Sequence, residues 1–263
     1  MDDTAHLLVR REGRIARLVV SNPSRRNAAT LAIWQAFPPA IRALSADTGI
    51  RAVVIEGAGT RDFMSGADIS EFHANHARAD AILALERAAI DAWDAVWNCP
   101  KPTVAAIHGY CLGGGLALAV CCDIRLAAED AMFGIPAVKL GAGYRADSMK
   151  RLRRLVGPAY AKEMLLTGRQ FRAGQAWRMG LLNSVVEKSR LFEVTAETVG
   201  IIAGGAPLTV AAVKLIDRGL DGHPEEQDAS TWEKAVQACF ASGDFIEGCA
   251  AFAERRAPVF SGR

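Results

Sequence analysis

The sequence lacks several patterns that would assign a class at once. Its six cysteines form no CxxC pair and no disulfide-like spacing, so we expect reduced, mostly buried thiols in a cytoplasmic protein. The formal net charge of +2 is too small to indicate a nucleic-acid partner. The charged N-terminal segment has no apolar run of the signal-peptide kind. No internal repeat and no low-complexity linker is present.

Two further patterns are incomplete. The run 104–122 has no charged residue and is long enough to imitate a membrane span. His108 and three glycines inside it indicate a buried strand and helix instead, so no membrane contact is expected. Gly57 and Gly59 begin a dinucleotide-binding fingerprint, but Asp62 stands where its third glycine belongs. We therefore expect neither a membrane span nor a dinucleotide site.

What is present predicts an α/β protein, because 51% of the residues are hydrophobic and strand-like and helix-like segments alternate. The expected strands are 15–20, 53–56, 103–107 and 123–127, and the first expected helices are 31–46 and 79–97. After about residue 157 the pattern is mainly helical: 158–167, 173–179, 191–203, 207–219 and 231–242. Pro158 and Pro207 suit first helical turns, and Gly180 suits a helix stop.

The most informative segment is 105–123, in which an apolar strand runs into Gly113, Gly114 and Gly115 before a small-residue helix. Glycines let a ligand approach the backbone closely, and the start of the helix presents unpaired N–H groups. The arrangement suits an anion, or an oxygen that becomes one during a reaction. The loop FMSGAD at 63–68 could supply a second N–H to the same pocket, which would make an oxyanion hole.

These segments resemble the crotonase superfamily, the enoyl-CoA hydratase/isomerase family. The resemblance lies in FMSGADI, AAIHGYCLGGGLALAVCCDIRLA, FGIPAVKLG, RLVGPAYAKEMLLTGRQFRAGQAWRMGLLNSVV and AFAERRAPVFSGR, which span almost the whole chain in the family's order. It implies a crotonase-like spiral of ββα units, with residues 1–200 as the core and 201–263 as a helical trimerisation region. It also implies a homotrimer or homohexamer, an acyl-CoA substrate in fatty acid metabolism, and oxyanion-hole donors at Ala67 N–H and Gly114 N–H.

The resemblance implies no cofactor beyond the CoA of the substrate. The positions that it matches to CoA contacts are Arg25, Arg26, Ala28, Ala67, Asp68, Phe252 and Arg255, the last two from a neighbouring subunit. For Arg25 and Arg26, a solvated loop is an equal alternative. His73, His76 and Glu71 have weak metal-ligand spacing, and we expect them to face solvent rather than bind a metal.

The departures from the family pattern concern its catalytic acids. Hydratases of the family hold water between two glutamates, and the matching positions here are Ala117 and Ala137. General acid–base groups contribute roughly 100- to 10,000-fold each. Efficient water addition by the usual mechanism is therefore not expected.

Four other residues could carry other chemistry. Tyr144 matches a tyrosine of the superfamily's methylmalonyl-CoA decarboxylases, and Arg145 could bind a substrate carboxylate bidentately. Alternatively, both only shape the pocket wall. Asp147 could act as a base or cap the helix that follows. His108 could shuttle protons, although a buried structural histidine is the simpler interpretation.

Three hypotheses about function remain open. The first is a decarboxylase- or lyase-like enzyme that forms an enolate at Ala67 and Gly114. The second is a hydratase or isomerase that uses Asp147 or His108 as a substitute base. The third is a non-catalytic acyl-CoA-binding homologue.

Overall fold

The computed structural model describes residues 5–68, 79–220 and 228–263. Its main sheet has six strands in the order β1-β2-β3-β4-β6-β9. These are β1 (His6–Glu12), β2 (Ile15–Ser21), β3 (Ala52–Gly57), β4 (Thr103–Ile107), β6 (Ile124–Ala128) and β9 (Ser184–Val186). Only the β1–β2 pair is antiparallel. Parallel pairs need crossover connections, which the intervening helices supply.

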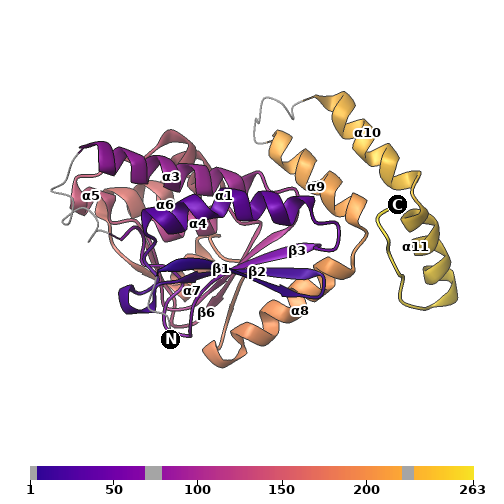
Figure 1. Cartoon of the computed structure of the whole chain (residues 1–263), viewed down its shortest axis with the longest axis horizontal. Coiled ribbons are helices and arrows are strands. Elements are labelled where there is room, and N and C mark those ends of the chain that lie inside the picture. The colour runs from indigo at the N-terminus through magenta and orange to yellow at the C-terminus, as the bar shows by residue number, and fades with distance from the viewer. Residues whose placement is uncertain (1–4, 69–78, 221–227) are drawn as a thin grey trace.

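The sheet is covered by helices on both faces, as Figure 1 shows. Because successive side chains of a strand point to opposite faces, β3 sends Val53 and Ile55 into one core cluster and Val54 into the other. The first cluster lies under α1 (Leu31–Ala46) and α3 (Ala79–Trp97), and the second lies against α8 (Leu191–Gly204). Burial on both faces explains why β3 and β4 read as continuous apolar runs.

A second sheet of three short strands connects the main sheet to the helices that follow it. Its order is β5-β7-β8, with β5 (Tyr110–Leu112), β7 (Met132–Gly134) and β8 (Phe171–Arg172). Strand β4 therefore continues into β5 and then α4 (Gly114–Val120), and β6 continues into β7 and then α5 (Ala137–Leu140). These are the strand–strand–helix units of the crotonase-like spiral, so the expected fold class is confirmed.

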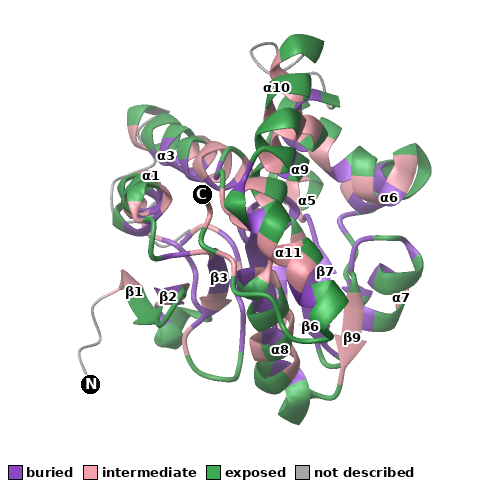
Figure 2. Ribbon diagram, turned by 90° about the vertical axis from the view of Figure 1, so that its right-hand side faces the viewer, coloured by how far each residue is buried: buried purple, intermediate pink, exposed green. Residues whose placement is uncertain are grey.

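The C-terminal part is helical, as expected. Besides α8, it comprises α6 (Ala146–Thr167), α7 (Ala173–Arg178), the short turn η2 (Lys188–Arg190), α9 (Pro207–Leu220), α10 (Ala229–Phe240) and α11 (Gly243–Glu254). Another short turn, η1 (Pro23–Arg25), lies between β2 and α1. Helix α6 is broken at Gly157, where φ is +72° and Pro158 begins the second half. Helices α10 and α11 project from the core and are largely exposed (Figures 1 and 2). Whether they mediate trimerisation stays a prediction.

The expected strands and helices all occur, most with bounds shifted by one or two residues. Strands β1, β5, β7, β8 and β9 and helices α5 and α11 were not expected. Helix α8 continues through residue 200, where the expected core ends. Among the described residues, no single helix is long and apolar enough to cross a membrane. The two helical segments 188–204 and 207–220, which are bent relative to each other, have the necessary length and apolar composition only when they are taken together.

Helix α4 packs against the loop before it so closely that Gly115 has no room for a side chain. A β-carbon there would lie 2.5 Å from the backbone oxygen of Met64. We predict that Gly115→Ala lowers the free energy of unfolding by about 1–3 kcal/mol, because the backbone must shift to admit the methyl group. Gly200→Ala is the matched control: a β-carbon there meets nothing within 4 Å, and it should stabilise by up to about 1 kcal/mol. Equal urea midpoints for the two variants would contradict the close approach.

Candidate active site

Two backbone segments form the floor of the candidate site: the loop 63–68 after β3, and the turn from β5 into α4. Met64 N–H donates to the Tyr110 carbonyl at 2.9 Å, and Leu112 N–H donates to the Met64 carbonyl at 3.0 Å. Phe63 N–H also donates to the His108 carbonyl at 2.7 Å. The loop is therefore held along β5 as an additional, strand-like segment.

The hydrogen bonds on either side of Ala67 determine where its N–H points. Ala29 N–H donates to the Gly66 carbonyl at 2.8 Å, and Asp68 N–H donates to the Ala29 carbonyl at 2.9 Å. Because alternate groups of an extended segment point to opposite sides, Ala67 N–H points away from Ala29. At Gly66, φ is +116° and a β-carbon would lie 3.7 Å from the Gly114 nitrogen. The residue before Ala67 thus lies directly against the start of α4.

The second backbone donor comes from the glycine turn. Gly113 N–H donates to the Gly134 carbonyl at 2.8 Å. Gly113 has φ +52° and ψ −119°, a backbone conformation that residues other than glycine rarely adopt. Gly114 follows as the first residue of α4, where an N–H has no partner within the helix. Within the described ranges, neither Ala67 N–H nor Gly114 N–H donates to a protein acceptor. The two N–H groups that the sequence predicted are thus free of described acceptors, and their role as an oxyanion hole stays a prediction.

Ala117 and Ala137 lie beside these donors. Ala117 is buried one turn along α4, and its N–H donates to the Gly113 carbonyl at 3.0 Å. Ala137 follows Pro136, whose Cδ would lie 3.9 Å from a β-carbon on Gly113. Each position contributes a methyl group that cannot carry a proton.

Tyr144 precedes α6 and packs, partly buried, against the main core cluster. Burial is the main cause that raises the pKa of Tyr144 above its ordinary value, and the neighbouring Cys121 adds to it. The phenol is therefore neutral and available as a hydrogen-bond donor.

Arg145 and Asp147, in contrast, face solvent. The Arg145 side chain is 57% exposed and lies 3.7 Å from Glu86 of α3. Arg145 is the N-cap residue of α6, and Asp147 lies exposed in its first turn, so Asp147 is not the cap. The proposed roles of Arg145 toward a carboxylate and of Asp147 as a base stay predictions.

His108 is buried, with 7% exposure, and its Nε2 has no hydrogen-bond partner among the described residues. Burial lowers its pKa below the ordinary value, and Lys188 adds to this shift, whereas Asp130 and Asp62 oppose it. Its backbone carbonyl fixes the loop 63–68 through Phe63. These contacts support the structural interpretation of His108.

The loop expected to contact CoA is ordered by an asparagine that the sequence analysis did not single out. Asn27 is buried with a positive φ of 55°, and its side-chain nitrogen donates to the carbonyls of Asp62 at 2.7 Å and Ala58 at 3.0 Å. Asparagine tolerates positive φ better than most residues, which was the available signal. This clamp joins the loop that bears Arg26 to the loop that bears Ala67.

Around this clamp, Arg25 and Arg26 are exposed, whereas Ala28 and Asp68 are buried. The Arg26 guanidinium lies 4.7 Å from the centre of the Tyr110 ring. Phe252 and Arg255 are exposed at the end of α11, which projects from the core. Their contact with a neighbouring subunit's CoA stays a prediction. His73, His76 and Glu71 lie outside the described residues.

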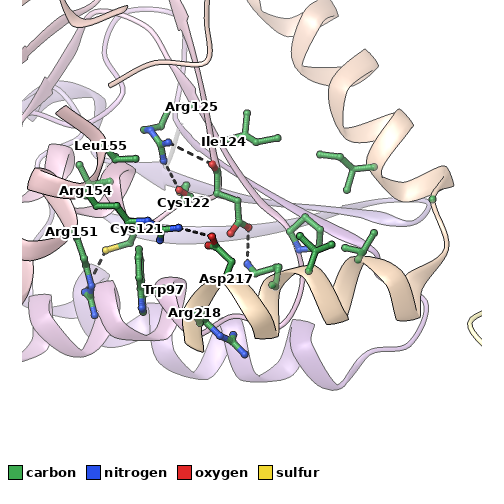
Figure 3. Close-up of a pocket in the computed structure, with 18 of the residues that line it drawn as sticks. Trp97, Cys121, Cys122, Ile124, Arg125, Arg151, Arg154, Leu155, Asp217 and Arg218 are labelled. Carbon is green, nitrogen blue, oxygen red and sulfur yellow. Dashed lines mark hydrogen bonds and ion pairs between the residues drawn. The ribbon is translucent and has the colours of Figure 1, made fainter. Parts of the chain in front are cut away.

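A separate cavity of about 600 Å³ lies between α9 and the far end of α4 (Figure 3). Its charged groups pair with one another: Lys214 contacts Asp123 at 2.6 Å, and Arg154 contacts Asp217 at 2.5 Å. Arg151 contacts the Cys121 sulfur at 3.5 Å. These pairs attach α9 to the core.

The structure combines an α/β fold with two backbone N–H groups, those of Ala67 and Gly114, that have no acceptor among the described residues. The enoyl-CoA hydratase/isomerase family model matches residues 10–263, and the chain belongs to this family, whose enzymes act on acyl-CoA. It is 33% identical to the short-chain-enoyl-CoA hydratase of Clostridium acetobutylicum over 95% of both chains. It is 32% identical to the 2,3-dehydroadipyl-CoA hydratase of Escherichia coli, covering 98% of this chain and 100% of that one.

A solved structure is also similar to this chain, both in fold and in sequence. The enoyl-CoA hydratase/carnithine racemase of Magnetospirillum magneticum has a TM-score of 0.90 and 39% identity, covering 100% of this chain and 97% of that one. The family predicted from the motifs is therefore confirmed.

Replacement of Gly114 tests the second oxyanion donor. Proline is common at the first position of a helix, and it removes the N–H there, so Gly114→Pro should lower kcat for acyl-CoA turnover by roughly 100- to 1,000-fold. Gly114→Ala keeps the N–H and is the control for steric effects, because a β-carbon there would lie 3.2 Å from Trp34 Cζ2. Circular dichroism and thermal melting establish that both variants fold. Equal kcat values for the folded variants would contradict the assignment.

His108 should make the fold sensitive to mild acid. Its folded pKa lies below the unfolded value of about 6.5, so the unfolded chain binds more protons in the interval between the two. The stability that a neutral His108 provides is therefore present above pH 6.5 and lost as the pH falls below it. We predict that urea midpoints fall less between pH 7.5 and 5.5 for His108→Gln than for the wild type. If the urea midpoints of the two proteins fell in parallel with pH, His108 would not be the cause of the acid sensitivity.

Proposed function

We propose that this enzyme forms a thioester enolate at Ala67 N–H and Gly114 N–H by loss of carbon dioxide from a carboxylated acyl-CoA. One observation carries the proposal: the two unpaired backbone donors lie beside the methyl groups of Ala117 and Ala137. The site can stabilise an oxyanion but has no acid or base at these positions. Decarboxylation fits such a site, because breaking the bond to the carboxylate itself supplies the electron pair of the enolate.

In the proposed reaction, the thioester oxygen accepts hydrogen bonds from Ala67 N–H and Gly114 N–H. The bond between the α-carbon and the carboxylate breaks, carbon dioxide leaves, and the electron pair delocalises onto the thioester oxygen. A proton from water or from the Tyr144 hydroxyl then adds to the α-carbon. Each backbone donor acts more strongly on the enolate than on the starting thioester, which is the requirement for catalysis.

Tyr144 suits an accompanying role as a donor toward the substrate. Its raised pKa keeps the phenol protonated, and its side chain packs partly buried against the core cluster that also contains the residues around α4. Arg145 is solvent-exposed, so its attraction for a substrate carboxylate would be screened. We therefore assign Tyr144 the larger contribution to orienting the carboxylate.

Hydration is the alternative, and it is favoured by the names of the relatives, several of which are hydratases or dehydratases. It needs a group that activates water. Of the two substitute bases considered, Asp147 is exposed in the first turn of α6, and His108 is buried among Asp62, Asp130 and Lys188. Neither observation supports a base directed at the substrate.

The deciding experiment follows carbon dioxide release from malonyl-CoA and methylmalonyl-CoA and, in parallel, hydration of crotonyl-CoA. We expect decarboxylation of at least one ester and no hydration above the buffer rate. Tyr144→Phe should lower decarboxylation by roughly 10-fold or more, whereas Tyr160→Phe, at a tyrosine 43% exposed on α6, should not. Hydration by the wild type would favour the alternative, and binding without any turnover would indicate a non-catalytic homologue.

A further inference from the structure

A further cavity, of about 650 Å³, lies at the amino ends of two central strands of the main sheet. Its walls include Arg51, directly before β3, and Lys101, two residues before β4. Val53 of β3 pairs with Thr103 of β4, and each cation stands two residues before this pair. The two side chains therefore leave adjacent chain segments, because paired strands lie about 4.8 Å apart. The candidate oxyanion donors follow the opposite, carboxyl ends of these strands.

The Arg51 guanidinium lies at the wall of this cavity. Its Nη1 donates to the carbonyls of Ala203 and Gly205 at 3.4 Å, and its Nη2 donates to the Phe260 carbonyl at 2.7 Å. Gly205 itself and Ser261, the neighbour of Phe260, line the cavity. A guanidinium has five N–H donors, so the Nε–H and one Nη2–H have no acceptor in the described part of the chain.

The Lys101 ammonium lies at the same cavity, at the carboxyl end of α1. It donates to the Leu44 carbonyl at 2.6 Å and to the Asp47 carbonyl. Ser45 and Thr48, the residues that follow these two, line the cavity. An ammonium has three N–H donors, and its contacts with the described residues use two of them. One donor is left for a ligand.

The composition of the wall suits a ligand that is both anionic and apolar. Of the described residues that line the cavity, Arg51, Lys101 and Arg263 are basic, and none is an aspartate or a glutamate. Much of the remaining wall is apolar: Ile50, Pro102, Ile202, Pro207, Leu208 and Val210. Cavities of roughly 300–1,000 Å³ with apolar walls and a few polar groups are typical of small-molecule sites.

The carboxylates closest to these cations are engaged with other partners. The Asp47 carboxylate pairs with Arg11 at 2.7 Å. The Asp244 carboxylate accepts from Ser261 N–H at 2.7 Å and from Gly262 N–H at 2.8 Å. Neither carboxylate belongs to a residue that lines the cavity except Asp244's two backbone donors, which hold the chain 261–262 in its wall. The positive charge at the cavity is therefore left without an acidic partner there.

The pKa values of the two cations agree with this lack of compensation. Burial is the main cause that lowers the pKa of both Arg51 and Lys101. Arg14 adds to the shift of Arg51, and the carboxylates Asp244 and Asp47 oppose the two shifts without cancelling them. A bound anion would favour the charged forms again, so the protein gains by taking one up.

We propose that this cavity binds a monocarboxylate with an apolar chain, whose carboxylate accepts hydrogen bonds from Lys101 and Arg51. The small number of remaining donors suits the two oxygens of one carboxylate. The chain of the ligand lies along the apolar walls. The site is separate from the candidate active site and does not depend on the proposed reaction.

Octanoate and 1-octanol are matched probes, because they share an eight-carbon chain and only octanoate carries a charge. Titration calorimetry measures both on the full chain, with excess butyryl-CoA present to keep the candidate active site occupied. We expect octanoate to bind the wild type at least about 10-fold more tightly than 1-octanol, since hydrogen bonds to charged groups are stronger than those to neutral ones.

Variants then locate the site. Lys101→Gln and Arg51→Gln remove a charge but keep N–H donors for the carbonyls, and each should raise the Kd of octanoate roughly 10- to 100-fold with little change for 1-octanol. Lys101→Arg keeps the charge and should retain binding within about 3-fold. Lys162→Gln, at an exposed lysine of α6, is the matched control. Circular dichroism and thermal melting establish that the variants fold.

The inference is overturned if the wild type binds octanoate no better than 1-octanol, a comparison that needs no variant to fold. It is also overturned if folded Lys101→Gln and Arg51→Gln bind octanoate as Lys162→Gln does. Inorganic phosphate is the third probe: displacement of octanoate by an equal concentration of phosphate would indicate a plain anion site and overturn the apolar part of the ligand.

Discussion

The close approach of two backbone segments, the loop 63–68 and the start of α4, is the constraint on which the site depends. It requires glycine at three places for two reasons. Gly66 and Gly113 have backbone angles that residues with a side chain disfavour, and Gly115 leaves no room for a β-carbon against Met64. In this arrangement Ala67 N–H and Gly114 N–H have no acceptor in the described part of the chain. The donors are therefore fixed by the fold, before any ligand binds.

The sequence predicted those parts of the fold that have strong local patterns. Strands β3 and β4 are continuous apolar runs, and α1 and α3 have clear helical periodicity. Strand β1 was missed because its second half, from Val9 to Glu12, is exposed and largely charged. Strands β5, β7 and β8 have only two or three residues each, too few for any period to show. Such short strands form because the chain around them is already held in place.

The site was predictable to the extent that it consists of backbone. The motifs at 63–68 and 113–115 indicated the two donors because their glycines mark turns whose backbone a ligand can approach closely. Side chains that act across the fold gave no such signal. Asn27 reaches carbonyls more than thirty residues away in sequence, and Trp34 meets Trp93 only because α1 packs on α3. A lone asparagine or tryptophan in a sequence has many ordinary explanations, and only tertiary contacts distinguish among them.

The different parts played by backbone and side chains are consistent with the chain belonging to this family while the reaction proposed for it differs from hydration. The oxyanion donors are peptide groups, so their position survives any substitution that keeps the turn. Ala117 lies on α4 and Ala137 follows Pro136, and a change of side chain at either position leaves the hydrogen bonds of Met64, Gly113 and Asp68 intact. Acid–base groups can thus be lost from these positions without disturbing the donors. The names of several relatives record hydration. Such a name is stronger evidence for the backbone donors than for the proton transfers, because the proton transfers depend on side chains at these two positions.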